Sequence, residues 1–338
     1  MAKTNKEKYR TKEYQAKAKD VIKDLIERAD QQIDEFVRDP EKLEKYLSFI
    51  SSVSNKYSPK NMVMIKKQFP GATILKSFTD WKREGTSIKQ GEKGIKILQP
   101  FDQDYVEIDN QIFWKDDWTD EIEEKVKNNQ LTVKRKLKGF KLTTTFDISQ
   151  TILTKEEYPK NYFTWFIDED IKNLDYNTEL FNELKKCISN QGLQIFENQS
   201  LGQVRGMTNN KNIWLNEHNS IKENVATLLH EYGHLKFKHS YKDTERSECE
   251  YQAEMIAYVL CKKLNVDTEQ ANFDYIKSWV NQSTQKDRSK WMKEVVDITR
   301  EINNELEQHF KEKYIKTEKS ILELAKQEDI AKDNKNIL

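Results

Sequence analysis

The chain has 338 residues, and its 57 Lys and Arg are balanced by 57 Asp and Glu, so the formal net charge is zero. This length fits about two domains of ordinary size. With only 9 glycines and 5 prolines, the sequence argues against an all-β fold rich in tight turns. The balanced charge gives no overall reason to expect a polyanionic partner, so only local clusters of charge can indicate one.

The sequence also argues against a membrane or secreted protein. No segment approaches the ~18 apolar residues of a membrane-spanning helix, and the charged N-terminus lacks the apolar core of a secretion signal. Cys187, Cys249 and Cys261 are an odd number of cysteines without a pairing pattern, which is typical of reduced thiols. We therefore expect a cytoplasmic protein with no membrane partner.

The first 40 residues have the charge density and thin apolar stripe of a solvated helical arm. An excess of Lys and Arg before residue 20 leaves open a contact with nucleic acid or an acidic partner. Residues 41–100 predict two helices, the second of which begins at Pro59 and ends before Gly71. Short apolar runs then predict strands at 72–75 and 95–98.

The rest of the chain alternates between charged and apolar segments. Residues 102–124 contain ten Asp and Glu against one Lys, which predicts an acidic surface insertion. Residues 131–148 return to the alternation of a strand, and residues 155–168 resemble a linker. Apolar residues at helical spacing over 275–302 predict helices that close a second domain, and residues 311–338 predict a charged tail.

His230, Glu231 and His234 belong to an H-E-x-x-H motif. Residues four apart on a helix project from one face, so the two histidines can bind one metal ion. Glu231 then lies beside the open position of the metal, where it can accept a proton from a bound water. A capping pattern at Ser220 and Glu223 supports a helix here. The alternatives are a chance match and a histidine satisfied in the core.

A catalytic zinc requires a third protein ligand, which lies outside this motif. The metzincin spacing would need Gly and His where this chain has Phe237 and Ser240, so that option fails. His239 is one residue short of the same spacing, and we expect it to face solvent after the helix.

Glu250 is the better candidate for the third ligand. It lies on the apolar stripe of a helix predicted over 247–264, where an unpaired buried carboxylate would be costly. A cap that reaches back to Ser247 is its alternative role, and Glu248, on another face of the helix, is the second choice as a ligand. Glu254, one turn further, can accept a hydrogen bond from the second nitrogen of a ligand histidine.

The HEYGH motif followed by Glu250-Tyr251-Gln252-Ala253-Glu254 resembles the gluzincin metallopeptidases, and within them the ImmA/IrrE type and its plasmid-borne relatives. This resemblance implies an α+β fold with an active-site helix and a general base at Glu231. It implies Zn²⁺ with three ligands: His230, His234 and Glu250. Such families often have Asp where this chain has Glu254. Three residues are candidates for stabilising an oxyanion: Tyr232, Tyr241 and His218.

Two basic segments flank the acidic one. Residues 54–98 contain ten basic residues against three acidic ones, and residues 131–141 contain five basic residues and no acidic one. Aromatic residues are interleaved with them: Tyr57, Phe69, Phe78, Trp81 and Phe140. Basic side chains that follow a phosphate backbone, beside rings that stack on bases, are the features of a site for single-stranded nucleic acid. A charged surface over an aromatic core is the alternative.

The order of residues in this region favours the first of these interpretations. Five blocks occur in sequence: Tyr57-Ser58-x-x-Asn61, Gln68-x-Pro70-x-Ala72-Thr73, Trp81, Gly91-x-x-Gly94-Ile95-x-Ile97-Leu98-x-Pro100 and Phe146-Asp147-Ile148-Ser149-Gln150-Thr151. They resemble the N-terminal domain of ArdC-like antirestriction proteins, whose relatives include LtrC-like proteins of Gram-positive conjugative elements. The resemblance covers roughly residues 41–153. That family joins this domain to a zincin domain with an HExxH motif.

The resemblance implies that the first domain binds single-stranded DNA, and that the protein acts in plasmid transfer or in protecting incoming DNA from restriction. We expect DNA contacts from seven basic residues: Lys66, Lys67, Lys82, Arg83, Lys89, Lys93 and Lys96. Either Tyr57 or Trp81 is expected to stack on a base, although Trp81 can equally belong to the core. The acidic segment either mimics DNA or points away from it.

The sequence thus predicts an α+β protein. Its expected parts are a charged helical arm (1–40), an α+β single-stranded-DNA-binding domain (41–154), a mostly helical zincin-like metallopeptidase domain (165–310) and a charged tail (311–338). Zn²⁺ is the expected cofactor, and single-stranded DNA and a protein substrate are the expected partners. Two alternatives remain: a regulatory zinc protease that cleaves a repressor, and a non-enzymatic DNA binder in which the zincin domain is a scaffold.

Overall fold

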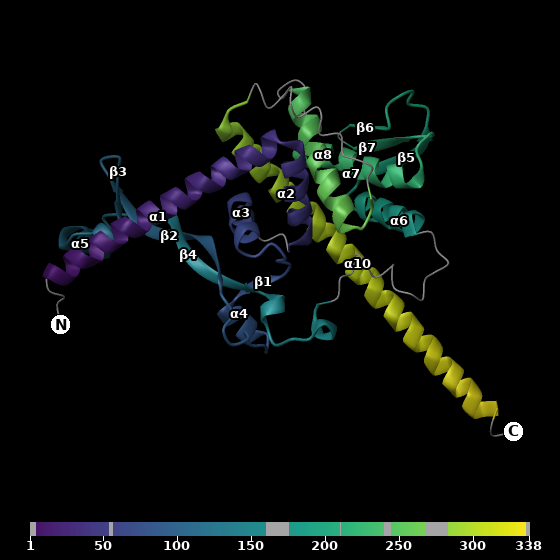
Figure 1. The fold of residues 1–338 in the computed structure, drawn as a ribbon, viewed down its shortest axis with the longest axis horizontal. Helices are drawn as coiled ribbons and strands as arrows, with labels where there is room; N and C mark the ends of the chain where they lie inside the picture. Colours follow the sequence, from purple (N-terminus) through teal and green to yellow (C-terminus); the bar gives the residue numbers. More distant parts are fainter. Residues whose placement is uncertain are drawn as a thin grey trace. The chain divides into compact units, whose positions relative to one another are not determined.

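The computed structural model describes residues 5–53, 57–159, 176–209, 211–239, 245–267 and 283–335. Tyr241 and the beginning of the predicted C-terminal helices, at residues 275–280, lie outside these ranges. The fold combines a sheet in the N-terminal half with a largely helical C-terminal half, which confirms the predicted α+β class (Figure 1).

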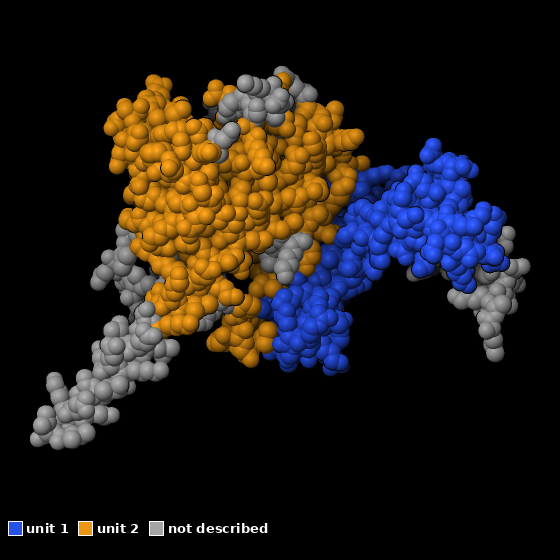
Figure 2. Space-filling view, turned by 180° about the vertical axis from the view of Figure 1, so that it is seen from behind, with its two compact units in different colours: residues 1–29, 64–70, 75–152 blue, residues 30–63, 71–74, 153–338 orange. Residues whose placement is uncertain are grey.

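The chain divides into two compact units, coloured separately in Figure 2. Unit 1 comprises Met1–Ala29, Met64–Pro70 and Leu75–Ile152, and unit 2 comprises Asp30–Val63, Gly71–Ile74 and Leu153–Leu338. Two helices contribute residues to both units: α1 (Asn5–Arg38) and α3 (Pro59–Gln68). The predicted domain boundaries are drawn from sequence motifs, whereas the two units are defined by contacts within the structure. The predicted boundaries therefore stay a prediction.

Unit 1 is built on an antiparallel sheet in the order β1-β4-β2-β3. Its strands are β1 (Leu75–Ser77), β2 (Ile95–Ile108), β3 (Gln111–Trp114) and β4 (Lys134–Asp147). Its shorter elements are α4 (Phe78–Arg83), η1 (Lys115–Asp117), α5 (Asp120–Lys127) and η2 (Ile148–Gln150). Alternate residues of the strands enter the core, as Leu75, Ile95 and Ile97 do.

The strands of unit 1 differ from the prediction at two places. The strand expected at 72–75 lies at Leu75–Ser77, because the residues before Leu75 pair with no described strand. The strand expected at 95–98 continues to Ile108 and turns into β3, so the first half of the acidic segment belongs to the sheet, and the second half forms η1 and the start of α5. Asp109 and Asn110, with φ of 50° and 62°, form the two-residue turn between these strands.

Several residues of the resemblance blocks hold this sheet together. The Gln68 side chain accepts from Lys96 N at 2.9 Å and donates to Lys96 O at 2.8 Å, so it covers the free edge of β2. Asp147 and Gln150 form a capping box, and Gln150 Nε2 also donates to the carbonyl oxygen of Lys93 at 3.0 Å. These residue types are therefore explained by the fold of unit 1 and not by a ligand.

Unit 2 combines helices with a small mixed sheet in the order β5-β7-β6. Its strands are β5 (Gln194–Gln199), β6 (Gly206–Thr208) and β7 (Asn212–Asn216), with β5 parallel and β6 antiparallel to β7. Its other elements are α2 (Pro40–Ser52), η3 (Lys155–Glu157), α6 (Tyr176–Ser189), α7 (Ile221–Phe237), α8 (Arg246–Lys263) and α10 (Gln285–Lys335). The helices predicted around residues 43–50, after Pro59 and over 247–264 are confirmed.

The helix α7 lies at the centre of unit 2. It packs against α8 on one side and against β6 and β7 on another. Ile213 and Leu215 of β7 are fully buried, as are Leu228 and Leu229 of α7. The predicted charged tail is the continuation of α10, which extends to Lys335.

The cysteines and the helices bear on the expectations of reduced thiols and of no membrane-spanning segment. All three cysteines are buried and none forms a disulfide; burial raises the pKa of the Cys187 and Cys261 thiols to about 12. None of the helices that the structure describes combines the length and the apolar character needed to cross a membrane.

Candidate metal centre and nucleic-acid interface

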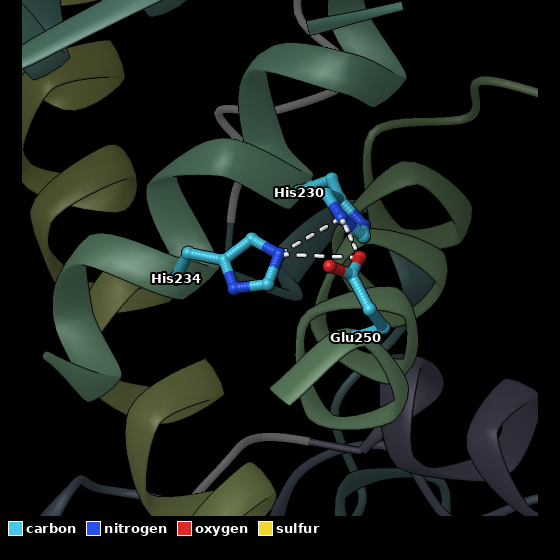
Figure 3. Close-up of side chains that lie close together, drawn as sticks. All are labelled: His230, His234 and Glu250. Atoms are coloured by element: carbon cyan, nitrogen blue, oxygen red, sulfur yellow. Dashed lines mark hydrogen bonds and ion pairs between the residues drawn. The ribbon is translucent and has the colours of Figure 1, made fainter. Parts of the chain in front are cut away.

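The H-E-x-x-H motif lies on the C-terminal half of α7. Ser220 and Glu223 form the predicted capping box, in which the Ser220 hydroxyl accepts from Glu223 N at 3.2 Å and Ser220 N donates to Glu223 Oε2 at 2.8 Å. These bonds satisfy backbone groups at the start of the helix. His230 and His234, one turn apart, project from the same face of the helix (Figure 3).

Three side chains converge beside α7. His230 Nε2 lies 3.1 Å from His234 Nε2 and 3.3 Å from Glu250 Oε2, and His234 Nε2 lies 3.5 Å from Glu250 Oε2. Figure 3 shows Glu250 reaching across from α8. Tetrahedral coordination with the usual zinc bond lengths places ligand atoms about 3.3 Å apart. Two imidazole nitrogens and one carboxylate oxygen at these spacings fit a divalent metal ion.

The charges of this group favour a cation at its centre. Burial opposes the charged form of His230, but hydrogen bonds with Glu250 and Glu254 outweigh it and raise the pKa of this imidazole to about 10. Hydrogen bonds from His230 and His234 hold the pKa of Glu250 well below its ordinary value, against the opposing effect of burial. A positive charge, whether a proton or a metal ion, is therefore stabilised where the three atoms meet.

Glu231 lies between the two histidines in sequence and is only 7% exposed. Burial raises the pKa of its carboxyl above the ordinary value, against the opposing effect of the two histidines. A raised pKa brings a carboxylate closer to the range in which it can both accept and return a proton. Strand β6 lies close to it, because a Cβ atom added to Gly206 would lie 3.1 Å from Glu231 Oε1.

Glu254 lies where the sequence predicts a partner for a ligand histidine. Its Oε2 atom is 3.2 Å from His230 Nδ1, the ring nitrogen that does not face the other two side chains. A carboxylate in this position fixes the tautomer of the ring and leaves the lone pair of Nε2 available to a metal. Glu254 and Glu250 come from the same helix, one turn apart, so α8 supplies both carboxylates.

His239 does not face solvent, in contrast to the prediction. Lys238 adopts the left-handed conformation with φ of 55°, and the chain folds back so that His239 N donates to His234 O at 3.1 Å. The two histidines approach through their Nδ1 atoms at 2.8 Å. Burial lowers the pKa of His239 to about 4. Spacing along the helix could not reveal this contact, because it depends on the turn after the helix.

The remaining candidates lie away from the three converging side chains. The Tyr232 hydroxyl donates to Glu305 Oε2 at 2.6 Å, so it is held by α10, and its predicted oxyanion role is wrong for this arrangement. The side chain of His218 is 80% exposed, and Glu248 does not join the group. Tyr241 lies outside the described residues.

Strand β6 presents an unpaired edge in the described part of the sheet, because it pairs only with β7. Its central residue, Met207, is 48% exposed, whereas the neighbouring Gly206 faces α7 and Glu231. A free edge next to a buried carboxylate can accept an extended peptide through backbone hydrogen bonds. The metal centre and the strand edge are therefore brought together by the packing of β6 on α7.

In unit 1, Trp81 is a core residue. Its side chain is 2% exposed, and its indole N–H donates to the carbonyl oxygen of Phe146 at 2.9 Å. A ring with so little free surface cannot stack on a base, so the stacking role predicted for Trp81 is wrong and its alternative role in the core is confirmed. Tyr57, the other predicted stacking residue, is half-buried and belongs to unit 2.

The predicted basic residues are mostly on the surface of unit 1. Lys66 is half-buried, and the other six are exposed: Lys67, Lys82, Arg83, Lys89, Lys93 and Lys96. Arg83 forms an ion pair with Asp80 at 3.0 Å. Lys89 donates to the carbonyl oxygen of Ser149 at 2.9 Å, so its ammonium group is held near the end of β4.

The acidic segment pairs with three of the five basic residues of the second basic segment. Lys134 pairs with Glu107 at 3.0 Å, Arg135 with Asp104 at 3.6 Å, and Lys138 with Asp116 at 3.1 Å. The first basic segment is different. Within the described part of the chain, five of its lysines have no carboxylate at ion-pair distance: Lys67, Lys82, Lys89, Lys93 and Lys96. A phosphate backbone would therefore meet more uncompensated charge along the first segment than along the second.

One face of the unit 1 sheet carries exposed rings together with one of these lysines, Lys96. We define the open face by six residues of α4, β2 and β4: Phe78, Lys96, Phe140, Leu142, Thr144 and Phe146. Phe78 is 55% and Phe140 38% exposed, and Lys96 Nζ donates to Thr144 Oγ1 at 2.6 Å. The alternation of residues along β4 could have shown from the sequence that Phe140 and Phe146 lie on the same face of the sheet.

Two family models match the chain, one in each half. The N-terminal domain of anti-restriction factor ArdC matches residues 12–146, and the IrrE N-terminal-like domain matches residues 189–264. The second match contains the whole H-E-x-x-H motif together with Glu250 and Glu254.

An uncharacterized protein of Bacillus anthracis is 28% identical to this chain and matches 83% of it. The chain spans about half of that relative, 51% of its length. Two solved structures of the antirestriction protein ArdC from the R388 plasmid are 18% identical. The metal-free one has a TM-score of 0.43 and covers 76% of this chain and 86% of its own. The Mn(II)-bound one has a TM-score of 0.45 and covers 83% and 97%.

The two domain models match in the order that the sequence resemblance implies. The first contains most of unit 1, and the second contains the converging side chains of unit 2. The chain is an ArdC-like protein of two domains, in which an anti-restriction-factor domain is followed by an IrrE-like, zincin-type domain.

Proposed function

We propose that this protein binds single-stranded DNA through unit 1 and hydrolyses peptide bonds at a zinc centre in unit 2, and that it acts in the cytoplasm. We further propose that it serves conjugative transfer or the protection of incoming DNA from restriction. The antirestriction role is supported by the match to the N-terminal domain of anti-restriction factor ArdC. The three free, buried cysteines support a reducing compartment.

The peptidase proposal rests on one observation, the convergence of His230, His234 and Glu250 next to the buried Glu231. These three residues would hold the zinc ion. When bound, zinc lowers the pKa of a water molecule and polarises a substrate carbonyl. The Glu231 carboxylate accepts a proton from the attacking water and returns it to the amine that leaves. Burial of Glu231 favours this exchange, because it brings the two protonation states closer in energy.

The substrate is proposed to lie along the free edge of β6. An extended peptide can pair with the backbone of Gly206–Thr208, which runs beside the general base. Gly206 permits β6 to lie this close to Glu231, because a Cβ atom there would clash with Thr227 and approach the Glu231 carboxylate to 3.1 Å. The peptide bond to be cut would then lie between the edge of β6 and the ligands on α7 and α8.

The experiment that tests the peptidase is a comparison of the purified chain with Glu231→Gln. Both proteins are loaded with zinc, the bound metal is quantified, and cleavage of unfolded casein is followed. We expect about one zinc per chain in both, and loss of at least a hundredfold in cleavage rate in the variant. Equal cleavage by both proteins would contradict the role of Glu231, and absence of bound zinc would contradict the centre itself.

The DNA-binding proposal rests on the open face, where exposed rings share one face with Lys96, a lysine without an acidic partner. Phe78 and Phe140 are proposed to stack on bases, and Lys93 and Lys96 to contact phosphates. Phe78 and Phe140 replace Trp81 in the stacking role.

Two pairs of matched variants test the open face on an oligonucleotide without secondary structure. Phe140→Ala should weaken binding about tenfold or more, whereas Ile112→Ala, a 41% exposed apolar residue on the acidic hairpin, should not. Lys96→Gln should lower the salt dependence of binding by about one phosphate contact, whereas Lys134→Gln, already paired with Glu107, should leave it unchanged. Equal effects within either pair would contradict the proposed face.

The two alternative functions are separated by the same Glu231→Gln variant in cells. If the protein is a DNA binder whose zincin domain is only a scaffold, the variant should still protect unmodified DNA that enters a restricting host. A protease that cleaves a repressor predicts that the variant loses its biological effect while DNA binding is retained. The measurement is the transfer efficiency of unmodified DNA in the presence of either protein.

A further inference from the structure

A chain of hydrogen bonds leads from His234 to a carboxylate on α10. His234 Nδ1 lies 2.8 Å from His239 Nδ1, and His239 Nε2 lies 2.9 Å from Gln252 Oε1. Gln252 Nε2 in turn donates to Glu294 Oε2 at 3.3 Å. The four side chains come from α7, the turn that follows it, α8 and α10, so the chain links three helices of unit 2.

The carboxylate of Glu294, at the end of this series of hydrogen bonds, determines which group donates and which accepts in each bond. An ionised Glu294 can only accept hydrogen bonds, so Gln252 must turn its NH₂ group to Glu294 and its oxygen to His239. That oxygen needs a donor, which places the proton of His239 on Nε2 and leaves Nδ1 as an acceptor. His234 must then carry its proton on Nδ1. Its Nε2 lone pair is left free, and this is the atom that faces His230 and Glu250.

The surroundings of His239 hold it in this place. Its ring stacks on Phe237, with centroids 4.7 Å apart and planes inclined by 8°. The left-handed Lys238 between them brings the ring back onto α7. Gln252 is only 3% exposed, so its amide has little freedom to turn toward water. His239 and Gln252 are therefore fixed both by packing and by hydrogen bonds.

We propose that His239, Gln252 and Glu294 are positioning residues that select the tautomer and ring orientation of His234 for metal binding. This inference rests on the metal centre of the proposed function. It gives each ligand histidine its own outer partner, since His230 is held directly by Glu254. Partners of this kind raise the affinity of a site because they remove the alternative tautomer and fix the ring.

The test is the zinc affinity of the full-length chain, measured by competition with a chromophoric chelator. His239→Phe preserves the stacking on Phe237 but removes both hydrogen bonds, and Gln252→Met preserves the volume of the amide side chain. We expect each to weaken zinc binding about 10- to 100-fold. Glu301→Gln is the matched control, because Glu301 also lies on α10 but forms its hydrogen bond with Lys236 rather than with Gln252. We expect its zinc affinity to equal that of the unsubstituted protein.

A second measurement separates positioning from general destabilisation. Long-range ¹H–¹⁵N NMR correlations report which ring nitrogen of each histidine carries a proton. In the zinc-loaded chain we expect the proton of His239 on Nε2 and that of His234 on Nδ1. In Glu294→Gln, whose amide can donate as well as accept, we expect a mixture of both His239 tautomers. A loss of fold stability alone would not produce this mixture.

The outcomes distinguish this inference from the metal centre on which it rests. If the unsubstituted chain binds zinc and His239→Phe and Gln252→Met bind it equally well, the positioning role is overturned and the centre stands. A His239 proton found on Nδ1 overturns the proposed direction of the chain. If the unsubstituted chain binds no zinc, the centre and the positioning role are overturned together.

Discussion

Gly206 controls how closely β6 approaches Glu231, the proposed general base. A Cβ atom added there would lie 2.4 Å from Thr227 Cγ2 and 3.1 Å from Glu231 Oε1. Thr227 is β-branched and sits inside a helix, so its methyl group cannot move aside easily. Any side chain at this position must displace either the strand or the carboxylate.

Gly206→Ala is therefore predicted to lower peptidase activity by at least tenfold while zinc remains bound, since the three metal-binding side chains are not touched. Gly71→Ala is the matched control in the same unit, because a Cβ atom there would meet nothing within 4 Å. Activity and bound zinc are measured on the same preparations. Normal cleavage by Gly206→Ala would show that the approach of β6 is not needed for catalysis.

At the scale of single residues, local spacing predicted the centre well and predicted its surroundings poorly. The separation of His230 and His234 follows from helix geometry alone, and Glu254 follows from the same geometry on the next helix. His239 and Trp81 were misjudged because their environments come from other parts of the chain. The turn at Lys238 folds His239 back onto α7, and the packing of α4 against β4 buries Trp81.

At the scale of elements, Gly233 lies where α7 and α8 pack against each other. A Cβ atom added to Gly233 would lie 3.5 Å from Ala253 Cα and 3.7 Å from Ala253 Cβ, which is ordinary contact. A small residue fits this position, because α8 packs close to α7 here. The contact leaves room for one methyl group.

Gly233→Ala is predicted to raise the free energy of unfolding by about 0.5–1 kcal/mol, because alanine favours the helix and restricts the unfolded chain. Denaturant unfolding of the metal-free protein measures this. Gly206→Ala, in the same series, should lower the stability instead. A loss of stability in Gly233→Ala would mean that α7 and α8 are closer than the 3.5 Å contact indicates.

The buried Glu183 joins α6 to α10. Burial opposes its charge, but hydrogen bonds from Lys186, Lys313 and His309 outweigh it and lower the pKa of Glu183 to about 2. A carboxyl whose pKa is lower in the folded state stabilises the fold above its ordinary pKa of 4.5. This stabilisation is lost as the pH falls from 4.5 toward 2.

Glu183→Gln is accordingly predicted to lose up to about 3 kcal/mol of stability at neutral pH, a difference that shrinks as the pH falls below 4.5. Unfolding of both proteins in urea at several pH values measures this difference. Glu312→Gln, an exposed position on α10, serves as the control and should show little change at any pH. A difference independent of pH would assign the effect to lost packing rather than to charge.

Helices were easier to predict than strands. The helices of unit 2 have caps and apolar stripes that are visible within one segment, as at Ser220 and along α8. The hairpin β2–β3 was missed because its acidic residues suggested a solvated insertion. Their partners are the basic residues of β4, more than twenty positions later, and only the sheet register shows that pairing.

At the scale of the whole molecule, the two proposed activities use different units. The metal centre is made by residues of unit 2 alone, and the open face by residues of unit 1 alone. The family match in each half agrees with this division. The order of the two domains could be predicted from sequence because each contains a motif with a local signature. The assignment of α2 to unit 2 could not, since it depends on contacts with α8.

Removal of zinc by a chelator is therefore predicted to leave the affinity for single-stranded DNA unchanged within about twofold, and Glu231→Gln is predicted to do the same. Fluorescence anisotropy of a labelled oligonucleotide, at one fixed salt concentration, measures both. The reverse comparison uses zinc binding with and without saturating oligonucleotide. A change of tenfold in either direction would reveal coupling that separate sites do not predict.

The burial of all three cysteines has a practical consequence for mapping the DNA. Their thiols are shielded, and the two with a pKa of about 12 hold almost no thiolate at neutral pH. A maleimide reagent should therefore not react with the native cysteines of the folded protein. A cysteine introduced in place of Lys93 would be labelled selectively, without prior removal of the native thiols. A photo-crosslinker attached at that single position could then report which nucleotides pass across unit 1.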